Sequence, residues 1–78
     1  MNKLEEFEAL LADGFNEALV GYAFRQTGPV ALYDRDKCIT ILMERDGMSL
    51  EGAVEFFEFN VLGAWVGENT PIFACLVI

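Results

Sequence analysis

The chain has 78 residues, a hydrophobic fraction of 54% and a formal net charge of −8 at pH 7. A chain this short buries only about 60% of the surface that its unfolded form exposes, so two domains are excluded and we expect a single domain over residues 1–78. The negative charge disfavours direct contact with nucleic-acid phosphates and with anionic lipid.

The first predicted element is an amphipathic helix over residues 3–12, with Leu4, Phe7, Leu10 and Leu11 at helical spacing before Gly14. Residues 18–25 are compatible with a helix or with a strand. We favour the strand, because a turn cluster at residues 26–29 and a short apolar run at residues 30–33 follow and predict a hairpin.

Three further elements complete the pattern. Asp34 is placed to cap a helix over about residues 35–45 that ends at Gly47. Ser49 is placed to cap a longer helix that reaches about residue 66, and residues 72–78 form an apolar strand after a turn. The expected order is αββααβ, an α+β fold in which about three antiparallel strands carry the helices on one face.

The apolar content exceeds the roughly 45–50% of an average soluble domain, and seven Phe residues contribute to it. A chain of fewer than about 70–80 residues normally needs a disulfide, a metal or oligomerisation as additional support. The sequence has no His, and Cys38 and Cys75 lack metal-ligand spacing. A disulfide between them stays open, but we interpret both as small buried apolar side chains. Oligomerisation is the remaining means of support, and we therefore expect a homo-oligomer.

The amino-terminal residues do not resemble a secretory signal, because Lys3 is followed by Glu5, Glu6 and Glu8. The longest apolar stretches, residues 61–67 and 72–78, are much shorter than the ~20 residues that span a bilayer. We therefore expect a cytoplasmic protein without a membrane span.

The helix predicted for residues 49–66 has two apolar stripes. One is the expected core stripe and contains Leu50, Ala53, Val54, Phe57, Val61, Ala64 and Trp65. The other lies nearly opposite and contains Gly52, Phe56, Phe59, Gly63 and Val66. Burial within the same chain and contact with another chain both explain the second stripe, and we take its five residues as the candidate protein interface.

Acidic residues offer a different hypothesis. Glu51, Glu55 and Glu58 project from one side of the same helix, a pattern that suits Mg²⁺ or Ca²⁺ but is more typical of a solvated face. Asp34, Asp36 and Asp46 are interpreted as helix-end residues. Because the chain lacks His and a phosphate-binding glycine loop, we predict no catalytic residue, metal or cofactor.

Several short runs carry a resemblance to other sequences. They are residues 33–39 (YDRDKCI), 45–49 (RDGMS), 55–61 (EFFEFNV), 63–68 (GAWVGE) and 70–73 (TPIF). Through these runs the chain resembles a group of short hypothetical proteins from bacteriophages and bacterial genomes. The resemblance implies a phage-related origin and assigns no activity. Residues 74–78 depart from the group, which puts a shared oligomeric state in question.

Four functions compete. The leading one is a small acidic phage-type protein that binds, and so blocks or redirects, a host or defence protein. The second is a self-associating subunit built through Phe56, Phe59 and the last strand. The third is an acidic mimic of nucleic acid. The fourth is a small metal-dependent enzyme that uses the glutamates or the Asp34 and Asp36 pair.

Overall fold

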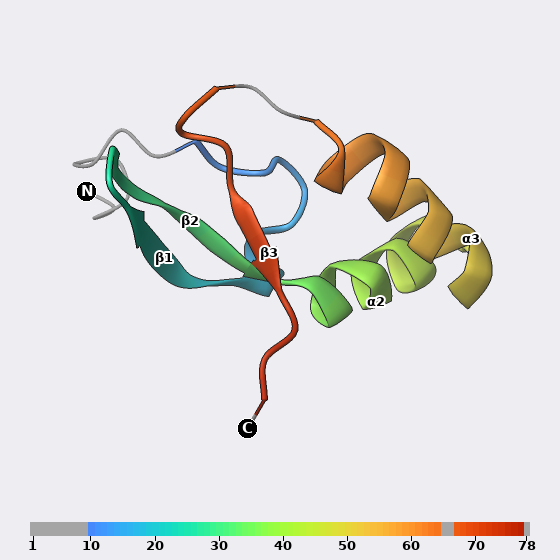
Figure 1. Cartoon of the computed structure of the whole chain (residues 1–78). Coiled ribbons are helices and arrows are strands. Elements are labelled where there is room, and N and C mark those ends of the chain that lie inside the picture. The colour runs from blue at the N-terminus through green and yellow to red at the C-terminus, as the bar shows by residue number, and fades with distance from the viewer. Residues whose placement is uncertain (1–9, 65–66, 78) are drawn as a thin grey trace.

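The computed structural model describes residues 10–64 and 67–77 and has an α+β fold, as the sequence predicts (Figure 1). Of the helix predicted over residues 3–12, residues 3–9 lie outside the described residues, and residues 10–12 are not helical. Among the described residues the order of the elements therefore differs from the predicted αββααβ. In chain order they are the 3-10 helix η1 (Asn16–Ala18), the strands β1 (Leu19–Arg25) and β2 (Gly28–Asp34), the helices α2 (Arg35–Asp46) and α3 (Leu50–Phe56), the π-helix η2 (Phe57–Leu62), and the strand β3 (Ile72–Ala74).

Strands β1 and β2 form the predicted antiparallel hairpin. Arg25 pairs with Gly28, so residues 26 and 27 make a two-residue turn. Gly28, which follows the two turn residues at the start of β2, has a φ of 128°, a conformation that favours glycine. The register shifts between Leu19 and Gly21, where Gly21 has a φ of 149°. The choice of a strand for residues 18–25 is confirmed over Leu19–Arg25, whereas Ala18 belongs to η1.

The third strand corrects the sequence prediction. β3 pairs with β2 in the parallel direction, so the sheet is mixed, with the order β1-β2-β3. The helices α2, α3 and η2 lie between β2 and β3 and return the chain so that β3 starts beside Leu32 and runs in the same direction as β2. β3 is also shorter than the predicted 72–78. Its pairing ends at Asp34 with Ala74, because β2 stops there and offers residues 75–77 no backbone partner.

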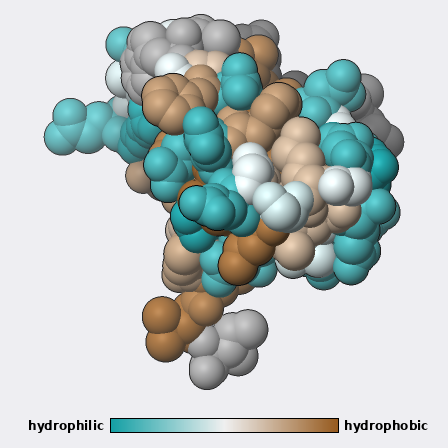
Figure 2. All heavy atoms as spheres, turned by 90° about the vertical axis from the view of Figure 1, so that its right-hand side faces the viewer, coloured by the Kyte–Doolittle hydropathy of each residue, from teal (hydrophilic) through white to brown (hydrophobic). Residues whose placement is uncertain are grey.

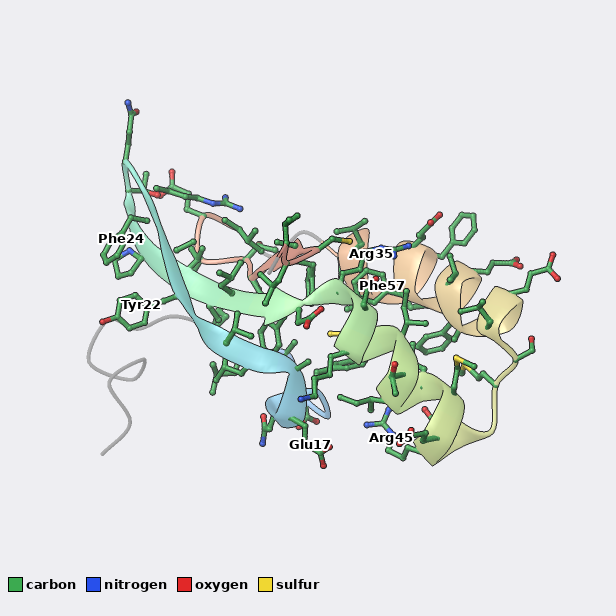
Figure 3. The ribbon with its side chains drawn as sticks, turned by 90° about the horizontal axis from the view of Figure 1, so that it is seen from below. Glu17, Tyr22, Phe24, Arg35, Arg45 and Phe57 are labelled. Atoms are coloured by element: carbon green, nitrogen blue, oxygen red, sulfur yellow. The ribbon has the colours of Figure 1, made fainter. Side chains whose placement is uncertain are left out.

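Helix α2 begins directly after β2, without a connecting loop. Asp34 ends β2 and also caps α2, because its Oδ1 accepts hydrogen bonds from the amides of Asp36 and Lys37 at 3.0 and 3.3 Å. Gly47 closes α2 in the left-handed conformation, with φ 68°. Both caps agree with the sequence. Since α2 continues directly from β2, the helices lie beyond the end of the sheet instead of covering one face as predicted (Figures 1 and 3).

The core lies where the carboxyl end of β2 meets the helices. Tyr33, Phe57, Leu42, Val30 and Cys38 are the largest fully buried side chains. The ring of Phe73 stacks on Tyr33 at 5.5 Å between centroids and meets the edge of Phe57 at 5.1 Å. Burying a side chain of this size stabilises the fold by about 1.5–3 kcal/mol. These aromatic contacts join β2, β3 and η2 to one another.

The segment before η1 is tied to this core. The Ala12 amide donates a hydrogen bond of 2.7 Å to the Tyr33 hydroxyl, which satisfies the polar end of a buried ring. Arg45 of α2 donates to the Gly14 carbonyl at 2.7 Å, and its guanidinium lies 5.6 Å from the centre of the Phe15 ring.

Within residues 10–64 and 67–77, the helices are too short or too polar to cross a membrane.

Candidate protein-interaction surface

The helix that carries the candidate interface starts as the sequence predicts. The Ser49 hydroxyl accepts a hydrogen bond of 3.1 Å from the Gly52 amide. A Cβ at Gly52 would lie 3.2 Å from that hydroxyl oxygen, which is a tight contact. The cap therefore provides a local reason for the glycine. A close approach by another chain, which we expected from the sequence, is not needed to explain it.

The second half of this helix differs from the prediction. After Phe56 the α-helix continues as the π-helix η2, and the helical segment ends at Leu62, not near residue 66. The Gly63 amide donates to the Glu58 carbonyl at 3.1 Å, which is an i to i+5 bond. A Cβ at Gly63 would lie 3.1 Å from that carbonyl oxygen, so this glycine also has a local role. Short π segments inside helices occur frequently at functional sites.

The core stripe is confirmed only at its centre. Ala53 and Phe57 are fully buried, and Val54 and Val61 pack against the core. Leu50 is exposed, because the first turn of α3 lies far from the sheet (Figure 1). Ala64 is also exposed, because the wider turns of η2 change the direction in which the residues after it point, relative to a regular α-helix. Trp65 lies outside the described residues.

The second stripe faces outward. Phe59 is 76% exposed and Phe56 is 39% exposed, so neither ring is sealed by the described chain. Gly52 is partly covered and Gly63 is exposed, and Val66 lies outside the described residues. Figure 2, which faces the helices, shows brown apolar side chains lying among teal hydrophilic ones. The second stripe predicted from the sequence is therefore accessible on the surface of the described chain.

An apolar groove of about 460 Å³ borders this stripe. Three separate parts of the chain form it: the segment before η1, the helical segment around Phe56, and the stretch that leads into β3. Its apolar lining includes Leu10, Leu11, Phe56, Val61, Pro71 and Phe73. Sequence reasoning missed this groove, because its walls are distant in sequence. The only available signal was the excess of apolar side chains over interior positions.

A smaller hollow of about 280 Å³ continues the groove along the helix. It is lined by Gly52, Glu55, Phe56, Phe59 and Asn60. Phe56 and Asn60 line both hollows, so the two adjoin on this part of the surface. We name this surface, the groove and the smaller hollow together, the α3 surface. The Asn60 amide donates to the Phe56 carbonyl at 3.2 Å, which holds Asn60 to the helix at the junction.

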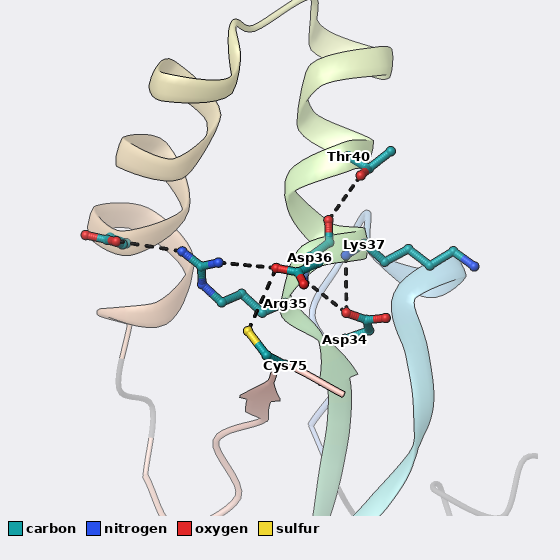
Figure 4. Close-up of polar contacts among 7 residues, drawn as sticks. Asp34, Arg35, Asp36, Lys37, Thr40 and Cys75 are labelled. Carbon is teal, nitrogen blue, oxygen red and sulfur yellow. Dashed lines mark hydrogen bonds and ion pairs between the residues drawn. The ribbon is translucent and has the colours of Figure 1, made fainter. Parts of the chain in front are cut away.

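The acidic side chains beside the α3 surface are exposed and only partly neutralised. Glu51, Glu55 and Glu58 are all exposed. The Arg35 guanidinium lies 3.9 Å from a carboxylate oxygen of Glu58 and 3.3 Å from one of Asp36, so it forms ion pairs with both acids (Figure 4). Surface pairs of this kind contribute little energy, about 0–1 kcal/mol.

The structure also bears on the metal hypotheses. In the part of the chain that is described, acidic and cysteine side chains do not gather in groups of three that would hold an ion. Asp34 serves as the cap of α2, and Asp46 forms an ion pair of 3.0 Å with Arg45. This hydrogen-bonded pairing lowers the pKa of Asp46.

The two cysteines have different surroundings. Cys38 is fully buried, and this burial, reinforced by the charge of Asp34, raises the pKa of its thiol to about 11. Cys75 is exposed, contrary to the prediction that both are buried, because β3 ends one residue earlier. Its Sγ lies 3.8 Å from Asp36 Oδ1 (Figure 4). Both thiols are free.

Comparisons with known proteins add no family to these observations. No protein-family model matches the chain, and searches of curated proteins and of solved structures find no significant match.

Proposed function

We propose that this protein is a non-enzymatic accessory protein that acts by binding another protein through the α3 surface. The exposure of Phe59 and Phe56 beside an apolar groove carries the proposal. An apolar surface patch beside a groove is typical of a binding site, and aromatic anchors and the pockets next to them dominate the energy of protein interfaces. The π-helix that presents Phe59 supports a specialised site.

The chemistry of the chain supports a binding role in preference to catalysis. The sequence has no His, so a general base near neutral pH would have to come from a perturbed carboxylate, thiol or amine. The thiol of Cys38 is buried with a raised pKa, which makes it a poor nucleophile. Asp34 and Asp46 already serve as cap and ion-pair partner.

The biological setting of the proposal comes from the resemblance to short phage proteins. A phage factor of this kind would act in the host cytoplasm and block or redirect a host or defence protein. The two free thiols suit a reducing compartment.

Self-association through the same surface is the second candidate. Exposed Phe59 can pack against its counterpart in a second copy, and the exposed apolar residues 76 and 77 add further surface after β3. Light scattering after size exclusion decides this, because a monomer at ~100 µM excludes micromolar self-association.

An acidic mimic of nucleic acid is the third candidate, and the exposed Glu51, Glu55 and Glu58 favour it. It requires binding to a nucleic-acid enzyme with an affinity that falls as the salt concentration rises.

The test of the proposal is an affinity capture with matched variants. Full-length protein and the Phe59→Glu variant are used as bait in a bacterial lysate. Phe24→Glu is the control, because Phe24 is 73% exposed, similar to the 76% of Phe59, but lies on β1. We expect a stoichiometric partner that is retained by wild type and Phe24→Glu and lost by Phe59→Glu. Equal capture by all three baits would refute binding through the α3 surface.

A further inference from the structure

We infer that the partner of the α3 surface is a basic amphipathic segment, whose apolar side chains enter the groove and whose Lys or Arg side chains meet the acids beside Phe59. This inference rests on the proposed function and adds the chemical class of the partner. It depends on three properties of the surface: the apolar lining of the groove, the sign of the charges along its border, and the self-repulsion of an acidic chain.

The groove provides the apolar part of the site. Phe56 and Phe73 line it, together with Pro71, Leu10 and other apolar side chains. A volume of about 460 Å³ falls within the ~300–1,000 Å³ range of ligand sites. An amphipathic helix typically anchors in such a groove through apolar residues at positions i, i+3 or i+4, and i+7.

The charges along the border are negative. Glu55 lines the smaller hollow beside Phe59, and Asp13 lines the groove. Glu51 precedes Glu55 by one helical turn and is also exposed. Among the described residues that line the two hollows, none is Lys or Arg. Cationic side chains of a partner would therefore meet acids on the border, and this complementarity increases specificity and the association rate.

The same charges argue against a second copy as the occupant. In a two-fold interface the same patch lies on both sides, so Glu51 and Glu55 of one copy would face the equivalent region of the other. Each copy also carries a net charge of −8. Like charges brought together across an interface oppose association, whereas a basic segment removes the repulsion.

The amino-terminal residues are an unfavourable occupant for the same reason. Residues 1–9 contain Lys3 and three glutamates, so their side chains carry a net negative charge. Placing them beside Glu55 and Asp13 would bring acid against acid.

The experiment measures binding of a labelled 18-residue helical peptide of Leu and Lys to the full-length protein by fluorescence anisotropy. A peptide with Glu in place of every Lys, and the same Leu positions, is the matched control. We expect the basic peptide to bind, with an affinity that falls steeply between 50 and 300 mM salt, and the acidic peptide not to bind. Phe59→Glu should abolish binding, and Phe24→Glu should leave it unchanged.

A charge variant tests the role of the border directly. Replacing Glu51 and Glu55 by Gln should weaken the affinity for the basic peptide about fivefold and reduce the salt dependence of that affinity. Equal binding of the two peptides, or an unchanged affinity in the double variant, overturns the inference. Competition by a synthetic peptide of residues 1–9 would assign the groove to the chain itself. A dimer that Phe59→Glu dissolves would assign it to a second copy.

The two proposals fail separately. If affinity capture yields a partner that depends on Phe59 but the basic peptide does not bind, the α3 surface is a binding site and the chemical class of its partner is wrong. If the capture shows no dependence on Phe59, the proposed function itself fails.

Discussion

The guanidinium of Arg35 lies over the Phe57 ring, 5.9 Å from its centroid, and so joins the start of α2 to the buried side of η2 (Figure 3). A nitrogen of the same guanidinium lies 3.9 Å from a Glu58 carboxylate oxygen. One side chain thus connects the core of the protein to the acidic border of the α3 surface. The relationship gives Arg35 two separable effects, on stability and on binding.

Replacing Arg35 by Met should lower the free energy of unfolding by about 1 kcal/mol, because the cation–π contact with Phe57 is lost while an apolar stem remains. The same change leaves Glu58 unpaired and makes the border more negative. Urea unfolding measures the first effect, and anisotropy with the basic peptide measures the second, which should be tighter binding. Arg35→Lys is the control and should lie between wild type and Met. Unchanged stability in Arg35→Met would show that the ring contact contributes nothing.

Phe57→Glu and Phe59→Glu separate the two sides of the helical segment. Phe57 is fully buried and in contact with Phe73, so a carboxylate there should unfold the protein, at a cost of more than about 4 kcal/mol. Phe59 is 76% exposed, so its replacement should change stability by less than about 0.5 kcal/mol. Circular dichroism during urea titration compares them. Equal loss of structure in both variants would show that the division into two sides is wrong.

The thiols should differ in reactivity. Cys75 is exposed and should react with a maleimide within minutes at pH 7.5. Cys38 is buried, and its pKa of about 11 leaves almost no thiolate at that pH, so it should react only after denaturation. Mass spectrometry of the labelled protein counts the modified sites. Two labels on the native protein would contradict the burial of Cys38.

Stability should fall at alkaline pH. Burial raises the pKa of Cys38 from 9.0 to about 11 and raises the pKa of Tyr33 as well. A group with a raised folded-state pKa stabilises the fold fully below its unfolded pKa, and this contribution is lost as pH rises through the folded value. The Tm should therefore drop between about pH 9 and 11. Cys38→Ala should show a smaller drop over that interval, and an identical drop would exclude this thiol as a cause.

The capping role of Asp34 can be measured with a conservative pair of variants. Asp34→Ala removes the acceptor of the Asp36 and Lys37 amides and should cost about 1 kcal/mol. Asp34→Asn keeps an oxygen in place and should cost much less. Chemical denaturation of the three proteins provides the comparison. Similar losses in Ala and Asn would mean that the charge, and not the hydrogen bonds, stabilises the start of α2.

The sequence was informative wherever structure depends on neighbouring residues. The caps at Asp34 and Ser49 and the left-handed Gly47 were readable, because a cap needs only a suitable side chain three residues or fewer from an exposed amide or carbonyl. The hairpin was readable for the same reason. Phe59 was separated from the core stripe because its helical spacing is a local property, but the sequence left open whether the second stripe is buried within the chain; the structure shows Phe59 exposed.

Features that depend on distant contacts were not readable. The parallel pairing of Leu32 with Ile72 depends on the path of two intervening helices. The π-helix η2 departs from the period of 100° per residue that was used to place the two stripes. The groove brings Leu10 and Pro71 together from opposite ends of the described chain, so its existence follows only from the folded arrangement.

The parallel contact between β2 and β3 has a consequence for the folding pathway. The hairpin can close from adjacent residues, but Ile72 must wait until both helices have formed, because Leu32 precedes it by forty positions. Until then residues 32–34 of β2 lack the strand that pairs with them, and the aromatic ring of Tyr33 has no stacking partner in Phe73. We expect this early species to be the state most prone to aggregate, so conditions that slow docking of the last strand should reduce the yield of native protein on refolding.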